Sequence, residues 1–344
     1  MNTISQTEIE ALIAALGAPT PSERWRAQEA LVGLGTPAEP RVLQALQHTD
    51  AYVRRGAAEV LSHIGGDSVA ALLVQSLSDP SPVVRERVAE ALATLGRPES
   101  APALEVVLVA DTTPAVRAMA AEALGKIPAK GLVTPLREAL KDASPAVRWS
   151  AAGALGAKKS RRGVLPLIAL LDDADAGVRA RAAEALGGRL DGRAMEPLAS
   201  ALRDPDFGVR WRAADALSGM RGARAVEVLS VSLLDPEPGV RWRAAAALGK
   251  AGKGSASAVD ALCALLADSD ANVRAHAAAA LGKLGDRRAL AALGALTGDK
   301  AETKLFGTVE EAAWVAIRKL GGSRAQGLRS PRRRRRSSAS RTQG

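Results

Sequence analysis

Residues 208–220 read GVRWRAADALSGM, and residues 239–252 read GVRWRAAAALGKAG, which is nearly the same sequence 31 residues later. Six further segments share the pattern, in which Val-Arg precedes an alanine-rich stretch, and the shared arginines are 31 to 33 residues apart. A fixed period of about 20–50 residues is the signature of a repeat architecture. The shared arginines are Arg54, Arg85, Arg117, Arg148, Arg179, Arg210, Arg241 and Arg274.

The two ends of the chain carry degenerate copies of the same unit. Residues 23–35, ERWRAQEALVGLG, place Arg24 in the register of the shared arginine, and residues 309–321, VEEAAWVAIRKLG, place Glu310 there. Atypical terminal units are what an open stack of repeats needs, because the outermost faces have no neighbour. The sequence therefore predicts about ten units with modified ends.

Each unit has the signals of two short helices. A residue that can cap a helix stands four positions before the shared arginine, and only Glu237 departs from the rule. Proline commonly follows the cap, and glycine commonly ends the helix, as at Gly65 and Gly125. No strand pattern is recognised, so the sequence predicts an all-α protein. The predicted caps are Thr20, Asp50, Ser81, Thr113, Ser144, Asp175, Asp206 and Asp270.

The pattern L-x-D-x-x-x-x-V-R-x-x-A-A-x-A-L-G resembles the HEAT-like repeat of the phycobilisome lyase type, and the resemblance covers roughly residues 20–321. It implies a right-handed α-solenoid of about ten HEAT-like helical hairpins. We therefore expect one solenoid over residues 1–321 and a disordered Arg-rich tail over residues 322–344. A fold of this kind hosts many functions, so the resemblance alone does not fix one.

Composition indicates which residues form the core and in which compartment the protein works. Apolar residues make up 47% of the chain and aromatic residues only 2%, so the interior must be built from Ala, Leu and Val. We expect no secretory signal and no membrane span, because no apolar run approaches the length that either requires. The single Cys263 lies in an apolar run, which predicts a buried, inert thiol and a cytoplasmic protein.

The net charge of +10 is unevenly distributed. Residues 322–344 contain eight arginines and no acidic residue, which leaves about +2 for residues 1–321. The basic character therefore belongs to the tail, where Arg332, Arg333, Arg334, Arg335 and Arg336 form an unbroken run.

The shared arginine has a structural interpretation. An aspartate stands six residues before it in seven units, close to the turn between the two helices. A partly buried arginine at that position can bind carboxylates or unpaired carbonyls and so tie neighbouring units together. The alternative is a ladder of anion-binding arginines. The seven aspartates are Asp79, Asp111, Asp142, Asp173, Asp204, Asp235 and Asp268.

The tryptophans suggest a binding face. Trp25, Trp149, Trp211 and Trp242 all follow the shared arginine directly, at a position predicted to be exposed. Arginine recurs at the next position, and exposed aromatics beside arginine resemble binding hot spots. Alternatively, each ring covers its own helix or stacks on a neighbouring arginine. Trp314 lies in the end unit and is expected to be structural. The predicted binding residues are Trp149, Arg181, Trp211, Arg212, Trp242 and Arg243.

The sequence offers no catalytic signature. Deoxyhypusine hydroxylase, an enzyme built on HEAT-like repeats, holds two irons with His-Glu pairs. The three histidines here are instead followed by Thr49, Ile64 and Ala277. We therefore expect no metal, no cofactor and no catalytic residues.

The favoured function is a non-enzymatic scaffold that binds an unidentified protein through the second helices. Two alternatives stay open. One is a lyase-type subunit that attaches a bilin chromophore, which the family resemblance suggests. The other is a nucleic-acid accessory protein that makes non-specific contacts through the basic tail. Carboxylates at one exposed register of the repeats, such as Glu59 and Glu184, oppose nucleic-acid binding by the repeats themselves.

Overall fold

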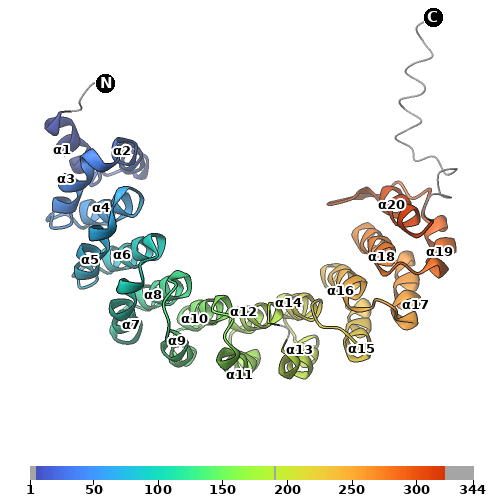
Figure 1. The fold of residues 1–344 in the computed structure, drawn as a ribbon. Coiled ribbons are helices and arrows are strands. Elements are labelled where there is room, and N and C mark those ends of the chain that lie inside the picture. Colours follow the sequence, from blue (N-terminus) through green and yellow to red (C-terminus); the bar gives the residue numbers. More distant parts are fainter. Residues whose placement is uncertain (1–4, 190, 322–344) are drawn as a thin grey trace, which may run out of the picture. The chain divides into compact units, whose positions relative to one another are not determined.

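The computed structural model describes residues 5–189 and 191–321, except for the side chains of Asp67 and Ser68. The predicted tail, residues 322–344, lies outside the described residues. The chain divides into two compact units, residues 1–170 and 171–344, and each is described by itself. Both consist of α-helices that alternate between the first and second helix of a repeat (Figure 1). The predicted all-α repeat fold is confirmed.

In the first unit, consecutive second helices pack against one another, and the first helices form a separate row (Figure 1). The first helices are α1 (Gln6–Ala15), α3 (Glu39–Ala45), α5 (Asp67–Ser76), α7 (Ala101–Ala110), α9 (Val133–Ala139) and α11 (Val164–Ala169). The second helices are α2 (Pro21–Leu34), α4 (Ala51–Ile64), α6 (Pro82–Leu95), α8 (Pro114–Lys126) and α10 (Pro145–Ala157).

The second unit has the same two-row arrangement. Its second helices are α12 (Ala176–Gly187), α14 (Phe207–Leu217), α16 (Pro238–Ala251), α18 (Ala271–Leu284) and α20 (Val309–Gly321). Its first helices are α13 (Met195–Ala201), α15 (Ala223–Val231), α17 (Ala256–Ala264) and α19 (Leu290–Ala295). Short 3-10 turns flank the first helices of both units. They are η1 (Thr36–Ala38), η2 (Pro98–Ser100), η3 (Arg161–Gly163), η4 (Leu170–Asp172), η5 (Gly192–Ala194), η6 (Ser232–Leu234), η7 (Leu265–Ala267) and η8 (Arg287–Ala289).

One prediction about strands is wrong. A two-stranded antiparallel ribbon, β1 (Glu302–Thr303) and β2 (Gly307–Thr308), precedes α20. The Thr303 hydroxyl closes the turn by donating to the Gly307 carbonyl at 3.1 Å, and Gly307 has a left-handed φ of 74°. Each strand has two residues, which is too short for an alternating apolar pattern, so the sequence carries no strand signal here.

The core is built from small residues on one face of each second helix. In α14, Val209, Ala213 and Leu217 are fully buried. Alanine has no atoms beyond Cβ, so neighbouring backbones can approach closely. The alanine-rich pattern therefore sets the tight packing of one repeat on the next.

The predicted cap residues all stand at helix N-termini, but not all of them cap through the side chain. The aspartates and Thr20 accept a bond from a first-turn amide. Ser81, Thr113 and Ser144 make no such bond, which corrects the prediction. At those three repeats, as at several of the repeats that do cap, the aspartate two residues earlier holds the turn, since its carboxylate accepts the cap residue's own N–H at 2.8 Å.

Several glycines that the sequence marks as helix ends have another role. Gly65, Gly96 and Gly285 do follow the last helical residue. Gly125 and Gly187 lie inside the last turn instead. A Cβ atom on Gly187 would lie only 2.7 Å from the Ala216 Cα atom on the neighbouring second helix. These glycines therefore allow close helix contact rather than a left-handed turn.

Replacing Gly249 with alanine is expected to lower the free energy of unfolding by about 1–3 kcal/mol, through overpacking. An added Cβ would lie 2.8 Å from the Ala280 Cβ and 2.9 Å from its Cα, which is backbone and cannot move aside. Gly239→Ala is the matched control, because the nearest atoms to its Cβ are 4.0 Å away. The control should be neutral or gain up to about 1 kcal/mol. Urea unfolding of both variants tests this, and equal stabilities would refute the packing argument.

Candidate binding face

The shared arginine forms a ladder with the aspartates near the inter-helix turns. Arg85 is typical: its Nε donates to Asp111 Oδ2 at 2.6 Å and its Nη2 donates to Oδ1 at 2.9 Å. Its Nη1 donates to the backbone carbonyl of Asp79 at 2.8 Å. Each such arginine thus binds its own turn and the carboxylate of the next repeat. Further pairs of this kind include Arg54–Asp79, Arg117–Asp142, Arg179–Asp204, Arg210–Asp235, Arg241–Asp268 and Arg274–Asp299.

This ladder confirms the structural interpretation of the shared arginine. Its guanidinium and carboxylate groups are mostly withdrawn from solvent and already paired, so these arginines do not form an anion-binding row. Asp299 was missed by the sequence reasoning, although it stands 25 residues after Arg274, the same interval that separates Arg54 from Asp79. Arg24 lies over the Tyr52 ring at 4.9 Å, and its Nη1 donates to the Ala18 carbonyl at 2.7 Å.

The ladder lowers the pKa of six of the aspartates named above. The hydrogen bond from Arg85 is the main cause for Asp111, where burial opposes it. Arg117 has the same effect on the pKa of Asp142, and Arg274 on that of Asp299. For Asp79, Asp204 and Asp268 burial is the largest single influence and raises the pKa, but the arginine and backbone bonds together outweigh it.

Acid is expected to destabilise the fold in two steps. Burial lowers the pKa of His276, so stability is lost first as the pH falls below its ordinary value of 6.5. The aspartates contribute stability above their ordinary value of 3.8, and it is lost as the pH falls through their lower folded values. Chemical unfolding between pH 8 and pH 3 should therefore show a shallow decline and then a steep one below about pH 4. In His276→Gln only the shallow step should vanish; a profile without the steep step would contradict the ladder.

The second unit carries a continuous row of rings on its second helices. The centroids of Trp211 and Trp242 are 6.2 Å apart with edge-to-face geometry, and Trp242 stacks on His276 at 4.6 Å. His276 in turn contacts Phe306, from the turn of the β-ribbon, at 4.9 Å. Four rings from α14, α16, α18 and the ribbon thus form one aromatic row.

An arginine joins two of these rings. The Arg243 guanidinium lies 4.1 Å from the Trp211 centroid and 4.6 Å from the Trp242 centroid, and Arg212 lies 4.9 Å from Trp211. Burial lowers the pKa of Arg243. The structure therefore brings Trp211 and Trp242 together, with Arg212 and Arg243 alongside.

The predicted exposure of these tryptophans is only partly right. Trp25 is 60% exposed and Trp149 is 39% exposed, both in the first unit. Trp211 and Trp242 are half-buried, because Arg243 and the neighbouring rings cover them. Trp149 belongs to the first unit and Arg181 to the second, so the structure does not test whether these two predicted binding residues share one face. Trp314 is half-buried in the end repeat, where its Nε1 donates to Glu310 Oε1 at 3.4 Å.

Carboxylates from the preceding repeats accompany the arginines of the face. Arg212 binds Glu184 at 3.1 Å, and Arg243 binds Asp215 at 3.1 Å. Arg181 also binds Glu184, at 2.9 Å. The exposed carboxylates that oppose nucleic-acid binding, such as Glu184, therefore form ion pairs with the arginines of the face. The positive charge of the face is largely neutralised within the protein.

An open pocket of about 380 Å³ adjoins Trp211 at the N-terminal ends of α14 and α16. Phe207, which is 60% exposed, and Trp211 provide its aromatic walls. Gly208 and Gly239 have no side chains there, and the exposed carboxylate of Glu237 lies at the edge. Neither Phe207 nor Glu237 is among the binding residues predicted from the sequence. The available signals were an aromatic after the Asp206 cap and the one cap position occupied by glutamate.

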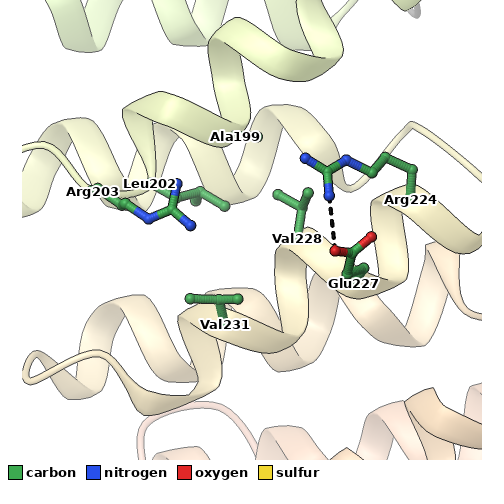
Figure 2. A pocket seen from close by; sticks show the side chains of 7 residues that line it. All are labelled: Ala199, Leu202, Arg203, Arg224, Glu227, Val228 and Val231. Carbon is green, nitrogen blue, oxygen red and sulfur yellow. Dashed lines mark ion pairs between the residues drawn. The ribbon is translucent and has the colours of Figure 1, made fainter.

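A second, smaller pocket lies between α13 and α15, on the first helices (Figure 2). Its volume is about 70 Å³, and Arg224 at its rim is paired with Glu227 at 2.9 Å. Figure 2 shows this ion pair beside the apolar side chains of Val228 and Val231. None of its lining residues belongs to the aromatic row.

Two further predictions concern reactive groups. Cys263 is half-buried rather than buried, and burial raises the pKa of its thiol, which disfavours the reactive thiolate. Within residues 5–189 and 191–321, no three His, Cys, Asp or Glu side chains are grouped so that they could hold a metal ion. No helix in the same ranges is both long enough and apolar enough to cross a membrane.

The chain matches the family described as HEAT repeats over residues 9–93, 101–167, 164–249 and 230–313. A match to the PBS lyase HEAT-like repeat covers residues 84–109. No curated protein matches the sequence.

Several solved structures are similar. The Escherichia coli protein YibA is 20% identical with a TM-score of 0.51, covering 88% of this chain and 98% of its own. An engineered protein is 23% identical with a TM-score of 0.48, covering 92% and 99%. Human deoxyhypusine hydroxylase in complex with glycerol is 27% identical with a TM-score of 0.32, covering 70% and 95%. At these levels only the YibA likeness bears on this chain, and it supports the fold alone.

Proposed function

The chain belongs to the HEAT-repeat family, and on that premise we propose that it is a non-enzymatic scaffold that holds a segment of another protein along its second helices. HEAT repeats generally mediate protein–protein contacts, which gives the proposal its starting point. The observation that carries it is the aromatic row of the second unit. The proposed face comprises Arg181, Trp211, Arg212, Trp242 and Arg243 in that unit, and Trp149 stays a predicted binding residue of the first unit.

The aromatic row has the chemistry of a binding hot spot. Trp, Tyr and Arg dominate such sites because they offer large contact areas together with polar groups. Trp211 and Trp242 keep part of their surface accessible, while Arg243 and His276 fix the positions of their rings. The two tryptophan side chains are therefore already ordered before a partner binds. Binding then costs less side-chain entropy than it would with mobile rings.

The neutralised arginines favour a protein ligand over a nucleic acid at this face. Binding to nucleic acid draws on unpaired cations that replace counterions at phosphates. Arg212 and Arg243 are bound to Glu184 and Asp215, whose carboxylates would repel phosphate. A protein segment can instead place apolar side chains on the rings and polar groups beside the ion pairs.

Affinity capture tests this function. The immobilised full chain is expected to retain a defined protein from a lysate of its source cells, and the same chain with Trp211→Ala and Trp242→Ala should not. Trp25→Ala is the matched control, because Trp25 occupies the same repeat position but lies in the first repeat, outside the proposed face. A protein retained equally by all three baits would argue against the face.

A further inference from the structure

We propose that the pocket beside Trp211 binds an arginine side chain from this chain's own C-terminal segment, residues 322–344. The inference rests on the proposed function, because the segment would occupy part of the face assigned to the partner. The segment lies outside the described residues, so the case depends on the chemistry of the pocket, its charge and its position relative to the end of α20.

The pocket walls suit a guanidinium group. A planar cation is attracted to aromatic faces and binds carboxylates through paired N–H donors. Phe207 and Trp211 provide the aromatic surface, and the exposed Glu237 provides a carboxylate. Unlike the aspartates at the equivalent position of neighbouring repeats, Glu237 makes no side-chain bond to its own helix. Its carboxylate therefore does not cap α16; its charge acts on Arg210, but that arginine is already bound by Asp235 at 2.7 Å.

The charged groups around the pocket are mostly paired with one another. The positive group lining the pocket, Arg212, is bound by Glu184 at 3.1 Å, and Arg243 nearby is bound by Asp215. The first-turn amides of α16 favour an anion, but Glu237 stands at that helix end and supplies one. Glu184 is shared by Arg181 and Arg212, so the pocket has no net negative charge. Among the described residues, however, the Glu237 carboxylate has no ion-pair partner, which leaves it open to a cation.

The segment is close enough to reach the pocket. Three ring-to-ring steps, none longer than 6.2 Å, lead from Trp211 to Phe306, and α20 begins three residues later. The 13 residues of α20 extend roughly 20 Å. A segment of 23 residues spans up to about 75 Å when extended. Because it follows α20 directly in the chain, its effective concentration near this unit is high. It contains eight arginines and no acidic residue.

The consequence is competition. A partner that uses the Trp211 end of the face must displace the arginine segment, so removing the segment's charge should expose the site. This gives the basic tail a role that does not require nucleic acid.

The test uses a fluorescein-labelled synthetic peptide of residues 327–341 and the full chain in which Arg332–Arg336 are replaced by glutamine. Fluorescence polarisation at about 0.15 M salt, where the screening length is about 8 Å, excludes long-range attraction as the cause. Glu237→Gln should weaken binding about fivefold or more, since one charge-assisted bond is lost at a partly exposed site. Gly239→Val should weaken it similarly by filling the pocket, and Val83 shows that the repeat accepts valine at this position.

Controls define what would overturn the proposal. Glu302→Gln removes the same charge from the same unit and should change nothing. Equal binding by the Glu237, Gly239 and Glu302 variants would remove the pocket as the site. A peptide with lysine for arginine should bind several-fold more weakly, and equal binding would overturn the guanidinium assignment.

Two further outcomes separate this inference from the proposed function. The chain with its native C-terminal segment should bind the labelled peptide at least about tenfold more weakly than the glutamine chain, because an effective concentration in the millimolar range competes. Equal binding would overturn the assignment to the chain's own segment. If Glu237→Gln abolished partner capture while the peptide failed to bind, the pocket would belong to a basic side chain of the partner, and the assignment to the C-terminal segment would fall.

Discussion

Replacing both Trp211 and Trp242 with alanine is expected to leave the protein folded while weakening partner binding by at least about thirtyfold. A hot-spot tryptophan typically contributes about 2 kcal/mol or more to binding when truncated, which corresponds to that factor. Both rings are half-buried and not part of the core, so the melting temperature should fall by only a few degrees. Titration calorimetry with the captured partner and a thermal melt measure the two quantities separately.

Trp25→Ala is again the control and should bind the partner normally. A different result for the double variant would contradict the prediction. If the double variant unfolds, or if it melts far below the wild type and still binds, the rings belong to the packing of α14, α16 and α18. The aromatic row would then be a structural stack with Arg243 as its centre.

Replacing Asp111 with alanine is expected to lower the free energy of unfolding by about 3 kcal/mol. Asp111 and Arg85 form a bidentate pair in which the carboxylate is only 6% exposed. Removing one member of such a pair leaves an uncompensated charge, which typically costs about 3–5 kcal/mol when the site is buried. The carboxylate also holds the N–H of Thr113 at the start of α8 at 2.8 Å, so its loss loosens that helix end. Urea unfolding at pH 7 measures the change.

Asp260→Ala is the matched control, because that carboxylate is 72% exposed and lies 3.9 Å from Arg288. An exposed pair of this kind contributes about 0–1 kcal/mol, so the control should change little. Equal effects of the two substitutions would mean that the ladder does not hold the repeats together.

Much of the fold could be predicted from the sequence, because the same helix signals recur in every repeat. Eight copies of one pattern place the shared arginine, its aspartate and the cap in register, and chance agreement at one copy matters little. The β-ribbon before α20 occurs once and has two residues in each strand, so no periodic sequence pattern predicts it. The glycines inside the last turns were misread for a related reason. Gly187 is explained by Ala216 on another helix, and local patterns do not reveal such a contact.

The candidate face was predicted in outline and not in detail. A helical projection places Trp211 and Trp242 at one register, and stacking of adjacent repeats then brings them together. The projection cannot show that Arg243 lies between the rings or that Asp215 neutralises it, because both facts depend on the separation and rotation of neighbouring helices. It also cannot reveal the role of Phe207, whose importance arises only from the pocket that it lines.

The ion pairs on the face refine the kind of partner expected. The sequence alone suggests a row of arginines that could bind carboxylates of the partner. In the structure Glu184 and Asp215 already occupy Arg212 and Arg243, so a partner carboxylate would have to displace an internal one. Apolar or aromatic side chains that pack on Trp211 and Trp242 face no such competition. We therefore expect the partner segment to be anchored by apolar groups.

The most direct measurement follows the indole N–H signals of the ¹⁵N-labelled full chain as the captured partner is added. The five tryptophans give separate signals that single Trp→Phe substitutions can assign. We expect the Trp211 and Trp242 signals to shift on binding while those of Trp25 and Trp314 stay in place. A bound complex in which Trp211 and Trp242 do not shift would contradict the claim that the aromatic row is the binding surface.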